Sequence, residues 1–202
     1  MNQLIFCDFD GVIRHWDNQG LFKTERELKL QKGTTFNVAF AAEYLVPAIT
    51  GKISDQVWRQ NVYDQLALQH SPEQAKMLID SWNHSPATIS LELLDLFQTQ
   101  LPDAKVALVT NATSRLEKDL INYNLVNRFD SIINSSAIGV AKPHHGFYMH
   151  ALEATNARIE SSIFIDDSVN NVLAAESFGL KGFHFQGAEL LQKEINRWLT
   201  TK

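Results

Sequence analysis

The chain has 202 residues, enough for one well-packed domain or for one domain carrying a modest insertion. Its residues are 45% hydrophobic and 20% charged, a composition typical of folded globular proteins and not of disordered chains. The formal net charge of −5 gives no support for a nucleic-acid partner or a membrane-surface partner, so we expect neither.

Charge appears early in the sequence, at Asp8 and Asp10, and the apolar run before them is short. No segment reaches the ~20 consecutive apolar residues that a membrane-spanning helix needs. We therefore expect a cytoplasmic protein, present as a monomer or a homodimer. The single cysteine, Cys7, lies inside the first apolar run and is expected to be a buried thiol without a catalytic role.

Short apolar segments that end in polar residues predict the strands of a mostly parallel sheet. These strands are expected at residues 4–7, 106–109, 131–134, 163–165 and 182–185. Amphipathic segments between them predict helices at residues 113–123, 145–157, 168–178 and 187–199. Strands that alternate with helices of this length predict an α/β fold.

The stretch from residue 14 to residue 86 has a different pattern. Helix-like segments are expected there at residues 24–31, 35–46, 54–69 and 72–83. Glycine and proline residues separate them, and no segment is a convincing strand. We therefore expect residues 1–13 and 87–202 to form the α/β core, with residues 14–86 inserted as a small helical domain.

Polar side chains collect at the carboxyl ends of the predicted strands, where open α/β sheets bind their ligands. They are Asp8, Asp10, Thr110, Asn111, Asp166 and Asp167. Four carboxylates in one place repel one another unless a hard cation lies among them, and oxygen-rich sites of this kind suit Mg²⁺. Lys142, in Ala141-Lys142-Pro143, is the one basic residue placed to join them.

Four motifs occur in order along the chain: Asp8-Phe9-Asp10-Gly11-Val12, Thr110-Asn111, Gly139-Val140-Ala141-Lys142-Pro143 and Ile165-Asp166-Asp167-Ser168. With these motifs the sequence resembles the haloacid dehalogenase-like superfamily, and the insertion is similar to the C1 cap of its phosphatases. The resemblance implies a three-layer Rossmann-like sheet with a helical cap. One departure is His144-His145 after Lys-Pro, where the family often has an acidic residue; it leaves Lys142 unaffected.

The resemblance also implies a role for each motif residue. Asp8 is the nucleophile that forms an aspartyl-phosphate, and Asp10 is the general acid and base. Thr110 and Asn111 bind the phosphoryl group, and Lys142 neutralises its charge. The Mg²⁺ ligands are Asp8, the backbone carbonyl of Asp10 and the acidic pair Asp166 and Asp167. For that pair the resemblance favours direct contact by Asp167 and contact through water by Asp166.

The implied activity is magnesium-dependent hydrolysis of a small soluble phosphomonoester. Residues 50–55 resemble those of bacterial sugar-phosphate phosphatases, which makes a sugar phosphate one candidate substrate. A phosphosugar mutase is the main alternative, because the phosphorylated aspartate could donate to a second sugar oxygen. A dehalogenase is disfavoured by Asp10, since a halide leaving group needs no proton. A non-catalytic binding protein is disfavoured because no catalytic position is lost.

Aromatic residues in or near the insertion have two interpretations. We expect core positions for Trp16, Trp58 and Trp82. The alternative is that they form a surface that contacts the substrate. Trp16 is the best candidate for a substrate contact, because it lies just past the first motif. His15 is expected to be a solvated loop residue, with a substrate contact as the alternative.

Overall fold

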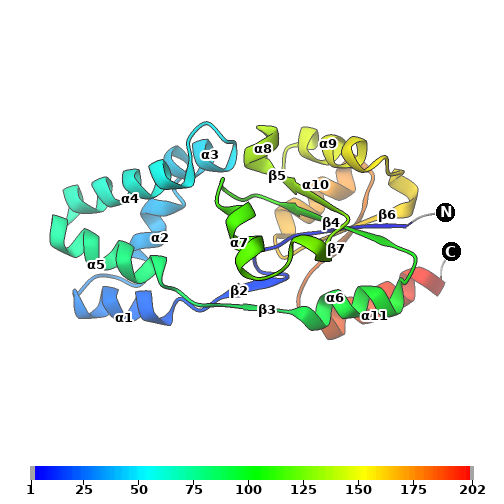
Figure 1. Cartoon of the computed structure of the whole chain (residues 1–202), viewed down its shortest axis with the longest axis horizontal. Coiled ribbons are helices and arrows are strands. Elements are labelled where there is room, and N and C mark those ends of the chain that lie inside the picture. Colours follow the sequence, from blue (N-terminus) through cyan, green and yellow to red (C-terminus); the bar gives the residue numbers. More distant parts are fainter. Residues whose placement is uncertain (1–2, 201–202) are drawn as a thin grey trace.

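The structure is a computed structural model that describes residues 3–200 (Figure 1). The outermost residues of the expected core, 1–2 and 201–202, lie outside this range. A five-stranded sheet has the order β5-β4-β1-β6-β7, and all its neighbours pair in parallel. Its strands are β1 (Leu4–Cys7), β4 (Lys105–Thr110), β5 (Ser131–Asn134), β6 (Ser162–Asp166) and β7 (Lys181–His184).

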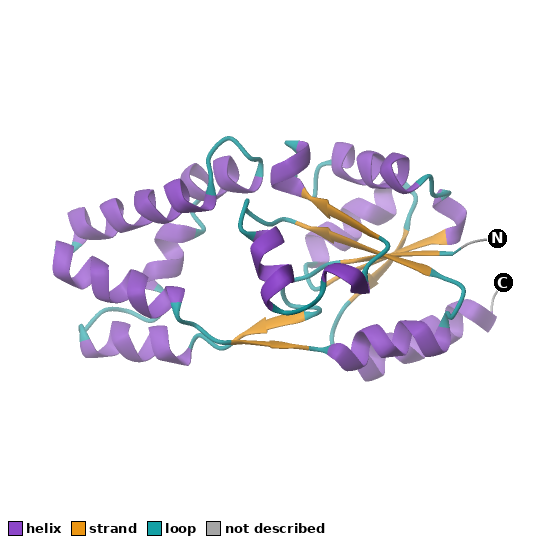
Figure 2. Cartoon of the chain, viewed as in Figure 1, coloured by secondary structure: helices purple, strands orange, loops and turns teal. Residues whose placement is uncertain are grey.

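Helices cover both faces of this sheet (Figure 2). They are α6 (Leu91–Gln100), α7 (Leu116–Asn122), α8 (Ser135–Ile138), α9 (His145–Thr155), α10 (Val169–Phe178) and α11 (Ala188–Thr200), with 3-10 turns η1 (Val126–Arg128) and η2 (Ile159–Ser161). Ile5 and Cys7 of β1 face the side covered by α6, α7 and α11, whereas Phe6 faces α9 and α10. The alternation places successive side chains of one strand in two cores, so the expected three-layer α/β fold is confirmed.

Five helices form a separate helical block between β2 (Arg14–Trp16) and β3 (Ala87–Ile89). They are α1 (Gln19–Glu27), α2 (Thr34–Ala39), α3 (Ala42–Ile49), α4 (Asp55–Gln69) and α5 (Pro72–Asn83). Serine side chains cap the two longest: Ser54 accepts from the Val57 N–H, and Ser71 accepts from the Gln74 N–H. The block has its own hydrophobic cluster around Trp58, distinct from the two clusters of the sheet.

The expectation that residues 14–86 contain no strand is wrong. β2 pairs antiparallel with β3 and forms a two-stranded ribbon that joins the helical block to the sheet (Figure 1). The expected boundaries separate the two paired strands, since β2 falls on the insertion side and β3 on the core side. Its register is Arg14 with Ile89 and Trp16 with Ala87. The exact division of the chain into core and insertion stays a prediction.

Helix boundaries in the block agree with expectation to differing degrees. The helices expected at 54–69 and 72–83 match α4 and α5 almost to the residue. The helix expected at 24–31 lies earlier, as α1, and the helix expected at 35–46 is divided into α2 and α3. Within residues 3–200, the helices are too short or too polar for any of them to cross a bilayer.

Candidate active site

The sheet brings the motif residues to one edge. β1 lies between β4 and β6, and all three strands run in the same direction. Asp8 follows β1, Thr110 is the last residue of β4, and Asp166 is the last residue of β6. All three are buried, because helices cover both faces of the sheet up to this edge.

Asp8 lies at the centre of the site. Its Oδ1 accepts a hydrogen bond from the Phe9 N–H at 2.7 Å and lies 2.9 Å from Lys142 Nζ. Burial, helped by the neighbouring Asp166 charge, raises the pKa of Asp8 to about 7 against the opposing effect of the Lys142 charge. The Asp8 carboxylate therefore needs more positive charge than Lys142 alone supplies.

Lys142 is completely buried and holds the site together. Its Nζ donates to Asp166 Oδ2 at 2.7 Å and to the Val109 carbonyl at 2.9 Å. Burial lowers the pKa of Lys142, but Asp8 and Asp166 outweigh burial, so the pKa is raised and the ammonium stays charged. Asn111 fixes the Lys142 backbone by accepting from its N–H and donating to its carbonyl, both at 2.8 Å.

The two aspartates of the fourth motif have different surroundings. Asp166 is fully buried, and its oxygens accept from Lys142, from the Ser168 N–H and from Asn171 Nδ2. Asp167 is exposed at the mouth of the site. Partial desolvation of its carboxylate and the neighbouring Asp166 raise the pKa of Asp167. Carboxylate oxygens of Asp8, Asp166 and Asp167 all lie within 4.8 Å of one another, which is close enough to share a cation.

Gly11 lets the first motif turn tightly against this cluster. It has φ of +85°, and a Cβ at this position would lie 2.1 Å from Asp167 Oδ2. The positive φ favours glycine, because L-residues with a side chain rarely adopt it, and a Cβ here would displace the Asp167 carboxylate. The turn is closed by the Ile13 and Arg14 N–H groups, which both donate to the Phe9 carbonyl.

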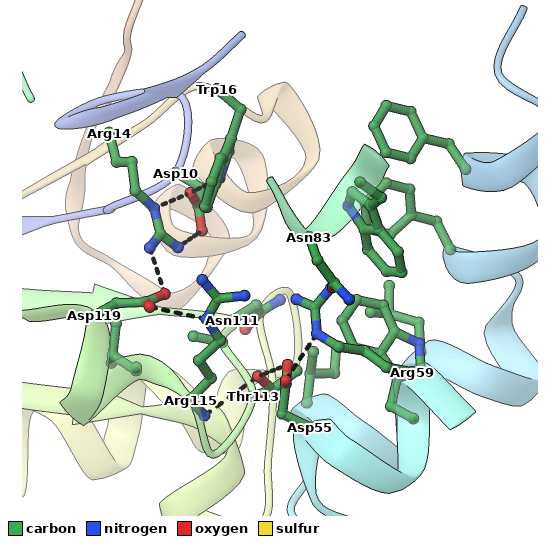
Figure 3. A pocket seen from close by; sticks show the side chains of 18 of the residues that line it. Asp10, Arg14, Trp16, Asp55, Arg59, Asn83, Asn111, Thr113, Arg115 and Asp119 are labelled. Atoms are coloured by element: carbon green, nitrogen blue, oxygen red, sulfur yellow. Dashed lines mark hydrogen bonds and ion pairs between the residues drawn. The ribbon is translucent and has the colours of Figure 1, made fainter. Parts of the chain in front are cut away.

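The Asp10 side chain does not join the acidic cluster. Arg14 holds both of its oxygens, with Nε to Oδ1 at 2.7 Å and Nη2 to Oδ2 at 2.9 Å. Trp16 Nε1 also donates to Oδ1, at 2.8 Å (Figure 3). The Asp10 carboxylate is 41% exposed. It therefore borders the space between the sheet and the helical block, next to the cluster centred on Asp8.

Sequence reasoning missed the ion-pair chain that continues from Asp10. Arg14 is buried between the rings of Phe9 and Trp16, and its Nη1 donates to Asp119 Oδ2 at 2.6 Å. Arg115 Nε donates to the other oxygen of Asp119, at 2.9 Å (Figure 3). Arg14 follows the first motif directly, but nothing local in the sequence links it to Asp119, which is 105 positions away.

A cavity of about 370 Å³ opens beside Asp10, between the sheet edge and the helical block (Figure 3). Trp16, Trp58 and Trp82 all line it. Trp58 is also buried in the hydrophobic cluster of the helical block, as expected. The same side chain therefore belongs to the core and forms part of the cavity wall. Trp16 is partly exposed, and His15 is exposed on β2.

Comparisons with known proteins agree with this architecture. The Bacteroides thetaiotaomicron HAD family enzyme, solved with magnesium and inorganic phosphate, has a TM-score of 0.69 and 18% identity, covering 91% of this chain and 93% of that one. A predicted HAD-like family hydrolase from Porphyromonas gingivalis has a TM-score of 0.74 and 19% identity, covering 98% of both chains. At these identities the similarity establishes the fold.

Among curated proteins, a sesquiterpene phosphatase from Aspergillus oryzae is 39% identical over 56 residues, which are 28% of this chain and 29% of that protein. Three of the curated relatives are matched over only 13 to 33% of their own length. A sequence model of the haloacid dehalogenase-like hydrolases matches residues 3–179, most of the chain. The chain therefore belongs to the haloacid dehalogenase-like hydrolases.

Proposed function

We propose that the protein is a magnesium-dependent phosphatase that hydrolyses small phosphomonoesters through an aspartyl-phosphate on Asp8. The observation that carries the proposal is the buried ion cluster. Lys142 lies between Asp8 and Asp166, with Asp167 beside them. Three carboxylates and one ammonium leave two negative charges in excess, which a divalent cation would balance.

The donor set fits magnesium. All the donors are oxygens, and magnesium prefers oxygen ligands and keeps several waters. Asp8 and Asp167 with the Asp10 carbonyl would hold the ion, and Asp166 would contribute through water, because Lys142, Ser168 and Asn171 already occupy its oxygens. When bound, magnesium supplies positive charge against the phosphoryl oxygens. The Bacteroides thetaiotaomicron enzyme solved with magnesium and phosphate supports the choice of magnesium as the ion.

The side chains of the site would then divide the reaction between them. Asp8 attacks phosphorus, and the bond from phosphorus to the leaving oxygen breaks. Lys142 stabilises the charge that develops, because its Nζ is fixed against Asp8 in the ground state. Thr110 and the Asn111 N–H bind the phosphoryl group from the end of β4.

Asp10 is the proposed acid and base. It would protonate the leaving oxygen and then take a proton from the water that hydrolyses the aspartyl-phosphate. Its position beside the cavity supports this role, since a leaving group at Asp8 would extend past Asp10. We also propose that the helical block acts as the cap that covers the substrate and limits water access.

A phosphatase assay with an aryl phosphate tests the proposal. We expect magnesium-dependent phosphate release that chelation removes and added magnesium restores. Asp8→Asn should abolish release, whereas Asp103→Asn should keep it, because Asp103 lies in the exposed turn before β4, at the opposite edge of the sheet. Full release after exhaustive chelation would contradict the proposed chemistry.

Isotope labelling separates hydrolysis from the mutase alternative. In H₂¹⁸O a phosphatase incorporates one labelled oxygen into each phosphate released, because water breaks the aspartyl-phosphate. A mutase returns the phosphoryl group to a sugar without label. Isomerised sugar phosphate that carries no ¹⁸O would favour the mutase.

A further inference from the structure

The cavity beside Asp10 has two unlike walls. The sheet side carries most of the charged groups, including Asp10, Arg14, Arg115 and Asp119, next to Trp16 and Leu116. The side formed by the helical block is mostly apolar, with contributions from four helices or their ends: Phe36, Phe40, Leu45, Ile49, Trp58 and Trp82. A substrate in this cavity would meet charge at one end and hydrocarbon at the other.

The rings of Phe36, Phe40, Trp58 and Trp82 contact one another and form a continuous surface, the aromatic wall. Phe36 contacts Phe40 at 5.2 Å and Trp82 at 6.3 Å between ring centroids. Trp58 meets Trp82 edge to face at 5.2 Å and Phe40 at 6.3 Å. Contacts of this geometry fix the rings against one another, so the wall is formed before any ligand binds.

Phe40 shows that this surface is not simply core. It lies just after α2 and is 51% exposed, although a large apolar side chain gains most when it is buried. Scattered exposed apolar residues are common, but Phe40 belongs to a cluster that lines a cavity. Covering its ring with an apolar ligand would remove that surface from water.

Several polar groups of the helical-block side are held by contacts with other protein groups. Trp58 Nε1 donates to the Ala39 carbonyl at 3.0 Å, so the indole presents carbon atoms to the cavity. Arg59 donates from Nε to Asp55 and from Nη1 to Asn83, both at 2.8 Å, and its guanidinium lies 4.4 Å from the centre of a Trp82 ring. The hydroxyl groups of a sugar placed against these rings would lose hydrogen bonds to water and gain contacts with aromatic carbon, which is unfavourable.

The cavity reaches two of the proposed active-site residues. Asp10 and Asn111, from the first and second motifs, line it together with the aromatic wall. A phosphoryl group held at Asp8 would therefore direct its leaving group past Asp10 towards the rings. The volume of about 370 Å³ is at the lower end of the range for small-molecule sites, which suits one compact hydrocarbon group.

We propose that the aromatic wall binds the hydrocarbon part of the leaving group. The preferred substrates are then phosphomonoesters of aromatic or branched aliphatic alcohols, in preference to sugar phosphates. The inference rests on the proposed phosphatase activity and names its substrate class. The reaction is ordinary hydrolysis: water supplies the oxygen that phosphate gains, and the alcohol leaves with a proton from Asp10.

The test compares primary alkyl phosphates, whose leaving oxygens are chemically alike: 2-(1-naphthyl)ethyl phosphate, citronellyl phosphate, glycerol 3-phosphate and glucose 6-phosphate. We expect kcat/KM to be at least about tenfold higher for the two apolar esters. The alcohol 2-(1-naphthyl)ethanol should inhibit competitively, whereas glycerol should not. A preference for glucose 6-phosphate or glycerol 3-phosphate would overturn the inference and leave the phosphatase assignment standing.

Variants test the wall itself. Phe40→Ala should lower the selectivity for naphthylethyl over glycerol phosphate at least about tenfold, mainly through a higher KM for the apolar ester. Leu68→Ala is the matched control, because Leu68 on α4 is 82% exposed and does not line the cavity. Unchanged selectivity in Phe40→Ala would refute the inference. No magnesium-dependent turnover of any ester would overturn the proposed function and this inference with it.

Discussion

Lys142→Met tests whether the buried lysine neutralises the carboxylates around it. Lys142 Nζ contacts Asp8 at 2.9 Å and Asp166 at 2.7 Å, and its side chain has no exposed surface. Methionine keeps the chain length but leaves two buried carboxylates without their cation. Removing one partner of a buried ion pair costs about 3–5 kcal/mol, so we expect a loss of this size in the free energy of unfolding.

The assay is urea unfolding of the metal-free protein at pH 7.5, followed by circular dichroism. For a chain of this length the loss corresponds to a fall in Tm of about 6–20 °C. Lys193→Met is the control: Lys193 contacts Glu189 at 2.7 Å, but its side chain is 63% exposed. A surface pair of this kind contributes under about 1 kcal/mol. If Lys142→Met were no less stable than Lys193→Met, the role given to Lys142 would be refuted.

Three further predictions follow from the site. Gly11→Ala should cost about 1–2 kcal/mol of stability because of its positive φ, and it should weaken magnesium activation because the new Cβ displaces Asp167. Gly20→Ala, with open space around its Cβ position, should do neither. Equal magnesium titrations of the two variants would contradict this. In a double-mutant cycle measured by urea unfolding, Arg14→Gln and Asp119→Asn should show a coupling free energy of about 1–3 kcal/mol. If the losses in unfolding free energy of the two single variants simply added in the double variant, their 2.6 Å contact would contribute nothing. The raised pKa of Asp8, about 7, means that the folded state binds this proton more tightly than the unfolded state. Its contribution to the stability of the metal-free protein is therefore most favourable below about pH 4 and is lost as pH rises to 7. The stability of wild type relative to Asp8→Asn should fall over that range, and a flat difference would contradict the raised pKa.

Local sequence patterns sufficed for the sheet and for the residues at its edge. Apolar runs ending at Asp8, Thr110 and Asp166 predicted the strand ends, and parallel topology brings such ends together. Lys142 was recognisable from its motif, and the structure places it against Asp8 and Asp166. The catalytic roles of these residues remain predictions.

What sequence reasoning missed depends on contacts between distant segments. β2 has only three residues, and its partner β3 is more than 70 positions later, so no alternation of apolar residues indicates either strand. The division of α2 from α3 occurs at Phe40 and Ala41, without the proline or glycine that usually signals a break. The aromatic wall was equally invisible, because its rings come from separate helices and meet only after folding.

Trapping the covalent intermediate tests the central claim most directly. Asp10→Asn should still form the aspartyl-phosphate from an aryl phosphate, whose leaving group departs without a proton, but should hydrolyse it slowly. Acid quenching after brief exposure to the substrate with magnesium, followed by peptide mass spectrometry, should locate the added phosphoryl group on Asp8. A phosphoryl group on another residue, or steady turnover of the aryl phosphate by Asp8→Asn, would contradict the account.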